Sequence, residues 1–261
     1  MKNFNFKSAS NTKEAAKLAS GRATFLAGGM SLLPAMKLRL AAYSDLINIK
    51  KIKTLSGIKV SSKSLRIGAT TTHASVASSK EVGKSIPSLA VLADGIGDPQ
   101  VRNRGTIGGS IANNDPAADY PSACLALNAT IHTSKRKIPA DKFFKGMFET
   151  DLKKGELIEA IEFELPEKSC YAKFPNPASR YAIVGVYVAK LQKEVRVAIT
   201  GAASSVFRSK ELESALSSNF SASSIDKVSI PSKELNSDIH ASSEYRAHII
   251  KVMARKAVSS C

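Results

Sequence analysis

Hydrophobic positions in the N-terminal part of the chain alternate between the spacing of strands and that of helices. Phe4 and Phe6 alternate with polar residues, as in a short strand, whereas Leu32, Leu33 and Met36 recur at helical intervals. Strands are predicted at residues 4–6, 23–27 and 46–49, and helices at 13–19 and 32–40. The order β-α-β-α-β favours short parallel strands joined by crossover helices.

The next part of the chain has the pattern of a sheet covered by helices. Residues 57–60 and 65–68 are apolar segments separated by a four-residue polar connection, which predicts a β-hairpin. Helices are predicted at residues 70–77, 86–96 and 116–127, and further strands at 129–133 and 156–165. Pro87 is compatible with the first turn of its helix.

The character of the chain changes after Pro166. Apolar strands are predicted at residues 181–191 and 195–202, and their short connection predicts an antiparallel pair; helices are predicted at 210–216 and 244–258. The predicted fold class is α+β. It has a two-part domain at residues 1–166, with a small βαβ-type subdomain at about 1–54 and a mixed or antiparallel sheet with helices at 55–166. A small α+β domain follows at residues 167–261.

Residues 98–119 lack both helix and strand periodicity and are rich in glycine, which is uncommon within a compact domain unless the segment is functional or disordered. Gly108 and Gly109 can adopt positive φ, so that successive N–H groups point into one concavity that binds anions. Thr106 and Ser110 add hydroxyl groups, and Asp119 is an acceptor suited to sugar hydroxyls. The alternative is a long surface loop with turn glycines.

A second glycine pair, Gly28-Gly29, lies between an apolar strand and a helix. This arrangement presents free N–H groups to a phosphate at a helix N-terminus. It matches neither the G-x-G-x-x-G dinucleotide fingerprint nor a Walker loop, which is absent from the chain. Two such pairs about 80 residues apart suit a pyrophosphate-bearing cofactor held from two sides.

Composition narrows the class of protein. The formal net charge is +16, but the lysines are scattered, aromatic residues make up 6% and tryptophan is absent, which argues against nucleic acid as a partner. A diffuse positive field favours an acidic partner subunit or simply reflects solubility. No apolar run is long enough for a membrane span, and the N-terminus lacks the apolar core of a secretory signal, so we expect a cytoplasmic protein.

Cysteine and histidine spacing predicts no metal site in this chain. The three cysteines are far apart with no C-x-x-C, and the four histidines form no pair at ligand spacing. We expect Cys124 to be a small core residue, Cys261 to be an exposed thiol, and the histidines to be structural or solvated.

The two glycine motifs together carry a family resemblance. Ala27-Gly-Gly-Met-Ser31 with the following Leu-Leu-Pro-Ala-Met-Lys-Leu-Arg, and Gln100-Val-Arg-Asn-Arg-Gly-Thr-Ile-Gly-Gly-Ser110, resemble the FAD-binding medium subunit of molybdenum hydroxylases of the carbon monoxide dehydrogenase and xanthine or aldehyde dehydrogenase type. Both flavin motifs of that family, A-G-G-x-S/T and T-I/V-G-G followed by Asn, Asp or Ser, are present. The likeness extends from about Lys2 to Leu165 and continues more weakly beyond.

The resemblance implies a set of FAD contacts but no catalytic residue on this chain. Ile96 is expected over the flavin ring and the backbone near Leu157 or Ile158 against the isoalloxazine. The chain departs from the family at Pro175 and Pro177, where relatives often have a basic residue that reaches the flavin, and Lys173 or Arg180 is the candidate substitute. The expected cofactor-binding residues are Ala27, Gly28, Gly29, Met30, Ser31, Ile96, Arg102, Thr106, Ile107, Gly108, Gly109, Ser110, Asp119, Leu157, Ile158 and Lys173.

The resemblance also implies an electron-transfer role. Electrons pass from a 2Fe-2S cluster in a small partner subunit through FAD to NAD, a quinone or oxygen, while a molybdopterin-binding large subunit oxidises the substrate. The expected assembly is a dimer of heterotrimers. Two other interpretations stay open at this point: a free-standing flavoprotein oxidoreductase of the same fold, and a basic scaffold that has lost its flavin.

Overall fold

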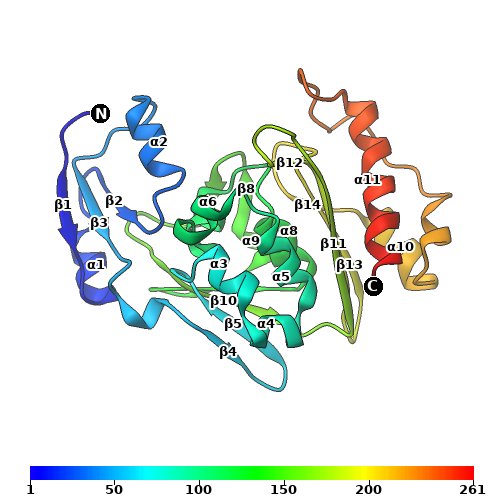
Figure 1. The fold of residues 1–261 in the computed structure, drawn as a ribbon, viewed down its shortest axis with the longest axis horizontal. Helices are drawn as coiled ribbons and strands as arrows, with labels where there is room; N and C mark the ends of the chain where they lie inside the picture. Colours follow the sequence, from blue (N-terminus) through cyan, green and yellow to red (C-terminus); the bar gives the residue numbers. More distant parts are fainter.

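A computed structural model describes residues 1–261 (Figure 1). The N-terminal lobe is a parallel sheet in the order β1-β3-β2, as the β-α-β-α-β pattern predicts. Its small core includes Leu157, which comes from a distant part of the chain. The elements of this lobe are β1 (Asn5–Ser8), α1 (Thr12–Leu18), β2 (Ala23–Leu26), α2 (Leu32–Lys37), β3 (Asp45–Asn48) and the 3-10 helix η1 (Lys53–Leu55).

The central part is a five-stranded antiparallel sheet in the order β4-β5-β10-β6-β7. Leu65, Ile67, Ile131, Ile161 and Phe163 belong to the same fully buried core as the apolar residues of the helices. The strands are β4 (Ile58–Val60), β5 (Ser64–Gly68), β6 (Thr130–Thr133), β7 (Lys137–Pro139) and β10 (Ile158–Glu164); the helices are α3 (His73–Ser78), α4 (Lys80–Ser85), α5 (Pro87–Asp94), α8 (Tyr120–Ala126) and α9 (Ala140–Phe143). A small hairpin, β8 (Phe144–Gly146) with β9 (Glu149–Thr150), extends from α9.

The segment at residues 98–119 is mostly helical, contrary to the prediction of an aperiodic loop. It contains α6 (Pro99–Arg104) and α7 (Ile107–Asn113), which begin at capping side chains. The Asp98 carboxylate accepts from Val101 N and the Thr106 hydroxyl accepts from Gly109 N. α6 buries no residue, and a glycine pair interrupts the apolar residues of α7, so neither shows an amphipathic period and the caps were the main local signal.

The C-terminal part is a four-stranded antiparallel sheet in the order β11-β12-β13-β14, covered by α11. The predicted antiparallel pair, β12 with β13, is present. The sequence analysis missed β11, whose polar residues obscure its apolar alternation. The elements are β11 (Lys168–Pro175), β12 (Ala182–Lys190), β13 (Val195–Thr200), β14 (Phe207–Arg208), α10 (Lys210–Ser218), the 3-10 helix η2 (Ala222–Ile225) and α11 (Ser243–Ser259).

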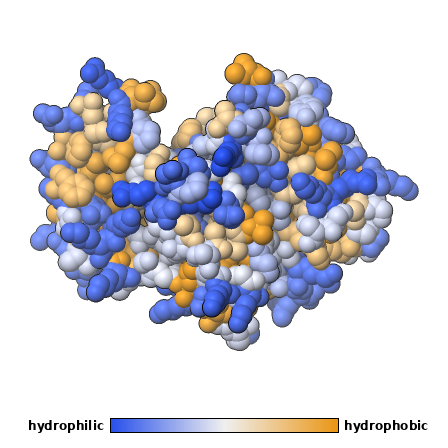
Figure 2. All heavy atoms as spheres, viewed as in Figure 1, coloured by the Kyte–Doolittle hydropathy of each residue, from blue (hydrophilic) through white to orange (hydrophobic).

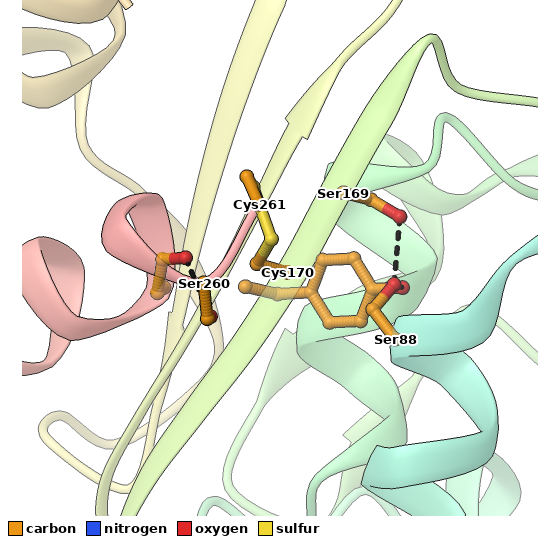
Figure 3. The surroundings of a disulfide bond; sticks show 7 residues. Ser88, Ser169, Cys170, Ser260 and Cys261 are labelled. Carbon is orange, nitrogen blue, oxygen red and sulfur yellow. Dashed lines mark hydrogen bonds between the residues drawn. A yellow bond between two sulfur atoms is a disulfide. The ribbon is translucent and has the colours of Figure 1, made fainter. Parts of the chain in front are cut away.

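A disulfide bond joins Cys170 on β11 to Cys261 after α11 (Figure 3). The two Cα atoms are 5.5 Å apart. The expectation that Cys261 is an exposed thiol is therefore wrong, because α11 folds back along the sheet and brings the end of the chain to β11. The expectation for Cys124 is confirmed: it is free and fully buried.

Residues from both sides of Pro166 contribute to the central core. Tyr187, Ala189 and Ala198 of the C-terminal sheet pack with the helices of the central part, so the third sheet is not an isolated body. We propose that the domain boundary still falls at residue 166, where the chain leaves the central sheet. No helix of the structure combines the length and the apolar character that crossing a bilayer requires.

Candidate functional site

The loop after β2 offers a run of free backbone donors. The N–H groups of Gly28, Gly29, Met30 and Ser31 donate to no other group of the chain. Gly29 has φ +77, in the left-handed region that favours glycine. Because α2 begins directly after this loop, the free donors lie at a helix N-terminus and suit a phosphate or other anion.

The second glycine pair is built differently from the predicted nest. Gly108 and Gly109 lie in the first turn of α7 and have no positive φ. Gly108 N donates to Ala69 O at 2.9 Å, and Gly109 N donates to the Thr106 hydroxyl at 3.1 Å. The prediction of an open concavity at this pair is therefore wrong, since both N–H groups donate to other groups of the chain. Gly109 is exposed and Ser110 is half-buried, so the first turn of α7 presents a surface without a side chain.

Tertiary packing brings the two glycine motifs into direct contact. A Cβ at position 28 would lie 2.2 Å from the Arg104 carbonyl oxygen, and a Cβ at position 108 would lie 2.5 Å from the Ala69 Cβ. Both glycines are therefore required for close backbone approach. The first loop packs on the α6–α7 connection, so the two glycine motifs are adjacent in the fold. Figure 2 shows the surface hollowed between the lobe that carries α2 and the lobe that carries α11.

Buried polar atoms without a partner lie next to this contact. A Cβ on Gly105 would lie 2.5 Å from His73 Nε2, and the rings of His73 and Tyr120 are 5.4 Å apart. His73 Nδ1, the Tyr120 hydroxyl and the Thr70 hydroxyl are buried and have no hydrogen-bond partner. Buried polar groups are normally paired, so these three atoms are exceptions, and Tyr120 is also part of the central hydrophobic core.

His73 is buried beside the second glycine motif, which agrees with the expectation of a structural histidine. Burial of the imidazole, with the nearby positive charge of Arg102, lowers the pKa of His73 to about 4. The side chain is therefore neutral at neutral pH, with one nitrogen as donor and one as acceptor. His73 is the first residue of α3, directly after the capping Thr72.

Asp119 is already engaged by protein groups. Its carboxylate accepts a hydrogen bond from the Tyr171 hydroxyl and pairs with Lys173 Nζ at 3.0 Å. Burial raises the pKa of Asp119, although Lys173 and Tyr171 both favour the charged form. Oδ1 contacts both Tyr171 and Lys173, whereas Oδ2 contacts Lys173 alone and can accept a second hydrogen bond. The role of Asp119 toward a sugar hydroxyl therefore stays a prediction.

Asp119→Ala is expected to lower the free energy of unfolding by about 3 kcal/mol, because it leaves the Lys173 ammonium and the Tyr171 hydroxyl buried without their acceptor. Urea denaturation of the flavin-free chain measures this change. Asp94→Ala is the control: Asp94 is exposed, lies 3.5 Å from Arg102 Nε, and its loss should cost less than about 1 kcal/mol. Equal effects of the two substitutions would contradict the buried pair.

The two basic candidates for the missing family contact both bind the segment at residues 95–97. Lys173 Nζ donates to Gly95 O at 2.8 Å, and Arg180 Nη1 donates to Gly97 O at 3.0 Å. Arg102 Nη1 donates to Ile96 O and Gly97 O. Ile96 itself is half-buried against the central core. The basic side chains therefore surround the backbone that carries Ile96.

Leu157 and Ile158 are held rigidly at the start of β10. Leu157 N donates to the Ser134 hydroxyl, and Leu157 O accepts from Ser134 N. The preceding Glu156 carboxylate accepts from Thr133, Arg136 and Lys153 N. Both apolar side chains are buried, Leu157 in the N-terminal lobe and Ile158 in the central core. Their contact with the isoalloxazine stays a prediction.

The Glu156 network predicts a loss of stability in acid. Burial of the Glu156 carboxyl favours its neutral form, but hydrogen bonds from Arg136 and Thr133 outweigh burial and lower its pKa from 4.5 to about 2. Its stabilisation is therefore complete above about pH 4.5 and disappears as the pH falls toward 2. In Glu156→Gln, the free energy of unfolding should fall by about 2 kcal/mol less on acidification than in wild type. This value is smaller than the pKa shift alone implies, because Arg136 is partly exposed and solvent screens the pair.

Denaturation of wild type and Glu156→Gln between pH 3 and pH 6 measures the difference in slope. Glu234→Gln, at an exposed carboxyl without a partner in the chain, is the control and should follow the wild-type curve. Parallel curves for wild type and Glu156→Gln would show that the Glu156 carboxylate is not stabilised by the fold.

The paired motifs and the three-sheet fold define a class of protein. Residues 2–167 match the family model described as the FAD binding domain in molybdopterin dehydrogenase. The chain therefore belongs to this family of FAD-binding oxidoreductase subunits, and its cofactor is FAD.

Individual relatives specify the type of subunit. The chain is 36% identical to the glyceraldehyde dehydrogenase medium chain of Sulfolobus acidocaldarius, over 97% of this chain and 96% of the relative. It is 37% identical to the carbon monoxide dehydrogenase medium chain of Hydrogenophaga pseudoflava, over 71% of this chain and 69% of the relative. A solved carbon monoxide dehydrogenase structure from Hydrogenophaga pseudoflava superposes with a TM-score of 0.86 at 32% identity, covering 99% of this chain and 96% of that one. The chain is thus similar to medium chains over essentially its whole length.

Proposed function

We propose that this chain is the electron-transfer subunit of a molybdenum-containing hydroxylase complex and holds FAD between its two glycine motifs. The contact between Gly28 and the Arg104–Gly105 backbone carries this proposal, because it joins the free donors of the first loop to the exposed first turn of α7. The FAD residues are those of the paired motifs, with Ile96, Arg102, Asp119, Leu157, Ile158 and Lys173 around them.

The chain's own groups bind and orient the cofactor. The N–H groups of Gly28 to Ser31 donate to the pyrophosphate, and each charge-assisted hydrogen bond contributes on the order of 1.5–3 kcal/mol. The bound FAD supplies the redox chemistry. No side chain of the site is assigned as a general acid, base or nucleophile, so substrate oxidation takes place on another subunit.

The partners in this proposal are a molybdopterin-binding large subunit and a small subunit with 2Fe-2S clusters, assembled as a dimer of heterotrimers. Electrons enter from the small subunit and leave to NAD, a quinone or oxygen. The net charge of +16 supports an acidic partner surface, since like-charged surfaces would repel. Two relatives are a "medium chain" and a "FAD-binding subunit", which are parts of larger assemblies.

The proposed location is the cytoplasm. The Cys170–Cys261 bond makes this testable, because disulfides are rare in reducing compartments. Alkylation of free thiols in intact cells, followed by mass spectrometry, reports the state of Cys261. If Cys261 is fully oxidised in cells whose free thiols were alkylated before lysis, this result would count against the cytoplasm as the location of the protein.

An absorption spectrum of the purified chain, before and after addition of FAD and removal of the excess, tests the proposal. Bound flavin gives bands at roughly 370 and 450 nm. A colourless chain, alone and when co-expressed with its partner subunits, would favour the flavin-free scaffold. Turnover of a substrate by the flavin-loaded chain without partners would favour a free-standing flavoprotein.

A further inference from the structure

Basic side chains donate to three consecutive backbone carbonyls between α5 and α6, those of residues 95, 96 and 97. Gly95 O accepts from Lys173, Ile96 O accepts from Arg102 at 3.0 Å, and Gly97 O accepts from Arg102 at 3.2 Å and from Arg180 at 3.0 Å. We call residues 95–98 the Ile96 loop. Gly97 has φ +52, so the loop has a defined turn at the residue that receives two of the bonds.

Arg180 differs from the other two cations. It comes from the turn between β11 and β12, which is 83 residues away, and it has φ +63 although it is not glycine. The turn is closed by bonds from Asn176 N to Tyr181 O and from Arg180 N to Asn176 O. A left-handed arginine is uncommon, and here the two backbone bonds of the turn hold the residue in this conformation. Its guanidinium pairs with no carboxylate and instead binds the backbone of the Ile96 loop.

The three cations are not equivalent in what they connect. Arg102 belongs to α6, which continues directly from the loop, so it cannot fix the loop relative to the C-terminal sheet. Lys173 joins that sheet to the first residue of the loop and also neutralises Asp119. Arg180 alone ties Gly97, on the other side of Ile96, to the C-terminal sheet.

We propose that Arg180 is a positioning residue that fixes the Ile96 loop against the C-terminal sheet and thereby sets the surface that Ile96 presents to the flavin. This inference rests on the proposed FAD site. It also accounts for the departure at Pro175 and Pro177: the basic residue of the turn acts on the loop backbone and not on the cofactor.

The experiment compares wild type, Arg180→Gly and Arg180→Lys as full-length chains. Glycine accepts the left-handed backbone and removes the whole side chain with its guanidinium, whereas lysine keeps an aliphatic chain and a charge. Arg39→Gly is the matched control, because Arg39 is an exposed arginine with φ +62 and no side-chain partner, at the end of α2. Hydrogen exchange of residues 95–98, measured by mass spectrometry without FAD, reports the loop directly.

We expect Arg180→Gly to speed exchange of the Ile96 loop about tenfold and to raise the Kd for FAD about fivefold, with unchanged denaturation midpoint. Arg180→Lys should recover part of both effects, and Arg39→Gly should match wild type.

Unchanged exchange in Arg180→Gly would overturn the proposal, even if FAD binding weakened, because Arg180 would then act on the cofactor directly. Faster exchange with wild-type FAD affinity would overturn the positioning role. A wild-type chain that binds no FAD would refute the proposed function, while exchange would still decide whether Arg180 holds the loop.

Discussion

Gly109→Val is expected to abolish FAD retention while leaving the fold largely intact. Gly109 is exposed in the first turn of α7, so a valine side chain there occupies the surface on which the proposed cofactor lies. Within the protein, the new Cβ would approach only the Thr106 hydroxyl, at 2.9 Å. Displacing this capping group costs about 1 kcal/mol, which is small beside the loss of several phosphate contacts.

The measurement is the ratio of bound flavin to protein, with far-UV circular dichroism to confirm folding. Gly83→Val is the matched control, because Gly83 is an exposed helical glycine in α4 whose added Cβ would meet no atom within 4 Å. A Gly109→Val protein that keeps its full flavin content would remove α7 from the proposed site. Gly28→Val cannot serve this purpose, since its clash with Arg104 O disrupts the packing itself.

Loss of the Cys170–Cys261 bond is expected to lower the free energy of unfolding by about 4–5 kcal/mol. The bond closes a loop with a sequence separation of 91 residues, and so restricts the unfolded chain strongly. It also fixes the end of α11 to β11, on the opposite side of the strand from the Ser88–Ser169 hydrogen bond (Figure 3). Cys261→Ser is the mildest substitution, because Cys261 is exposed whereas Cys170 is buried.

Guanidinium denaturation of wild type and Cys261→Ser, each with and without reductant, measures the effect. Reductant should lower the midpoint of wild type to that of Cys261→Ser and leave the variant unchanged. The buried free Cys124 makes no disulfide and so does not respond to reductant. Identical midpoints for oxidised and reduced wild type would show that the bond contributes nothing to stability.

Much of the fold follows from local sequence. The parallel lobe, the hairpin of β4 with β5, and α11 each have a period that only one kind of element satisfies. The two glycine motifs also indicated the family, which the match over residues 2–167 confirms. Local sequence did not predict β11, because its polar residues Ser169 and Tyr171 bind the buried Ser88 of α5 and Asp119 before α8. It also did not predict α6 and α7, because neither has a regular apolar spacing.

The sequence by itself thus determined the class of fold, the cofactor family and the two glycine motifs that carry it. Tertiary structure alone decided that Gly28 packs against Arg104, that Asp119 shares a buried network with Lys173 and Tyr171, and that Cys261 reaches Cys170. The physical reason is the range of the interactions. Periodicity, caps and turns act between residues close in the chain, whereas close backbone approach, buried ion pairs and disulfides depend on how separate elements pack.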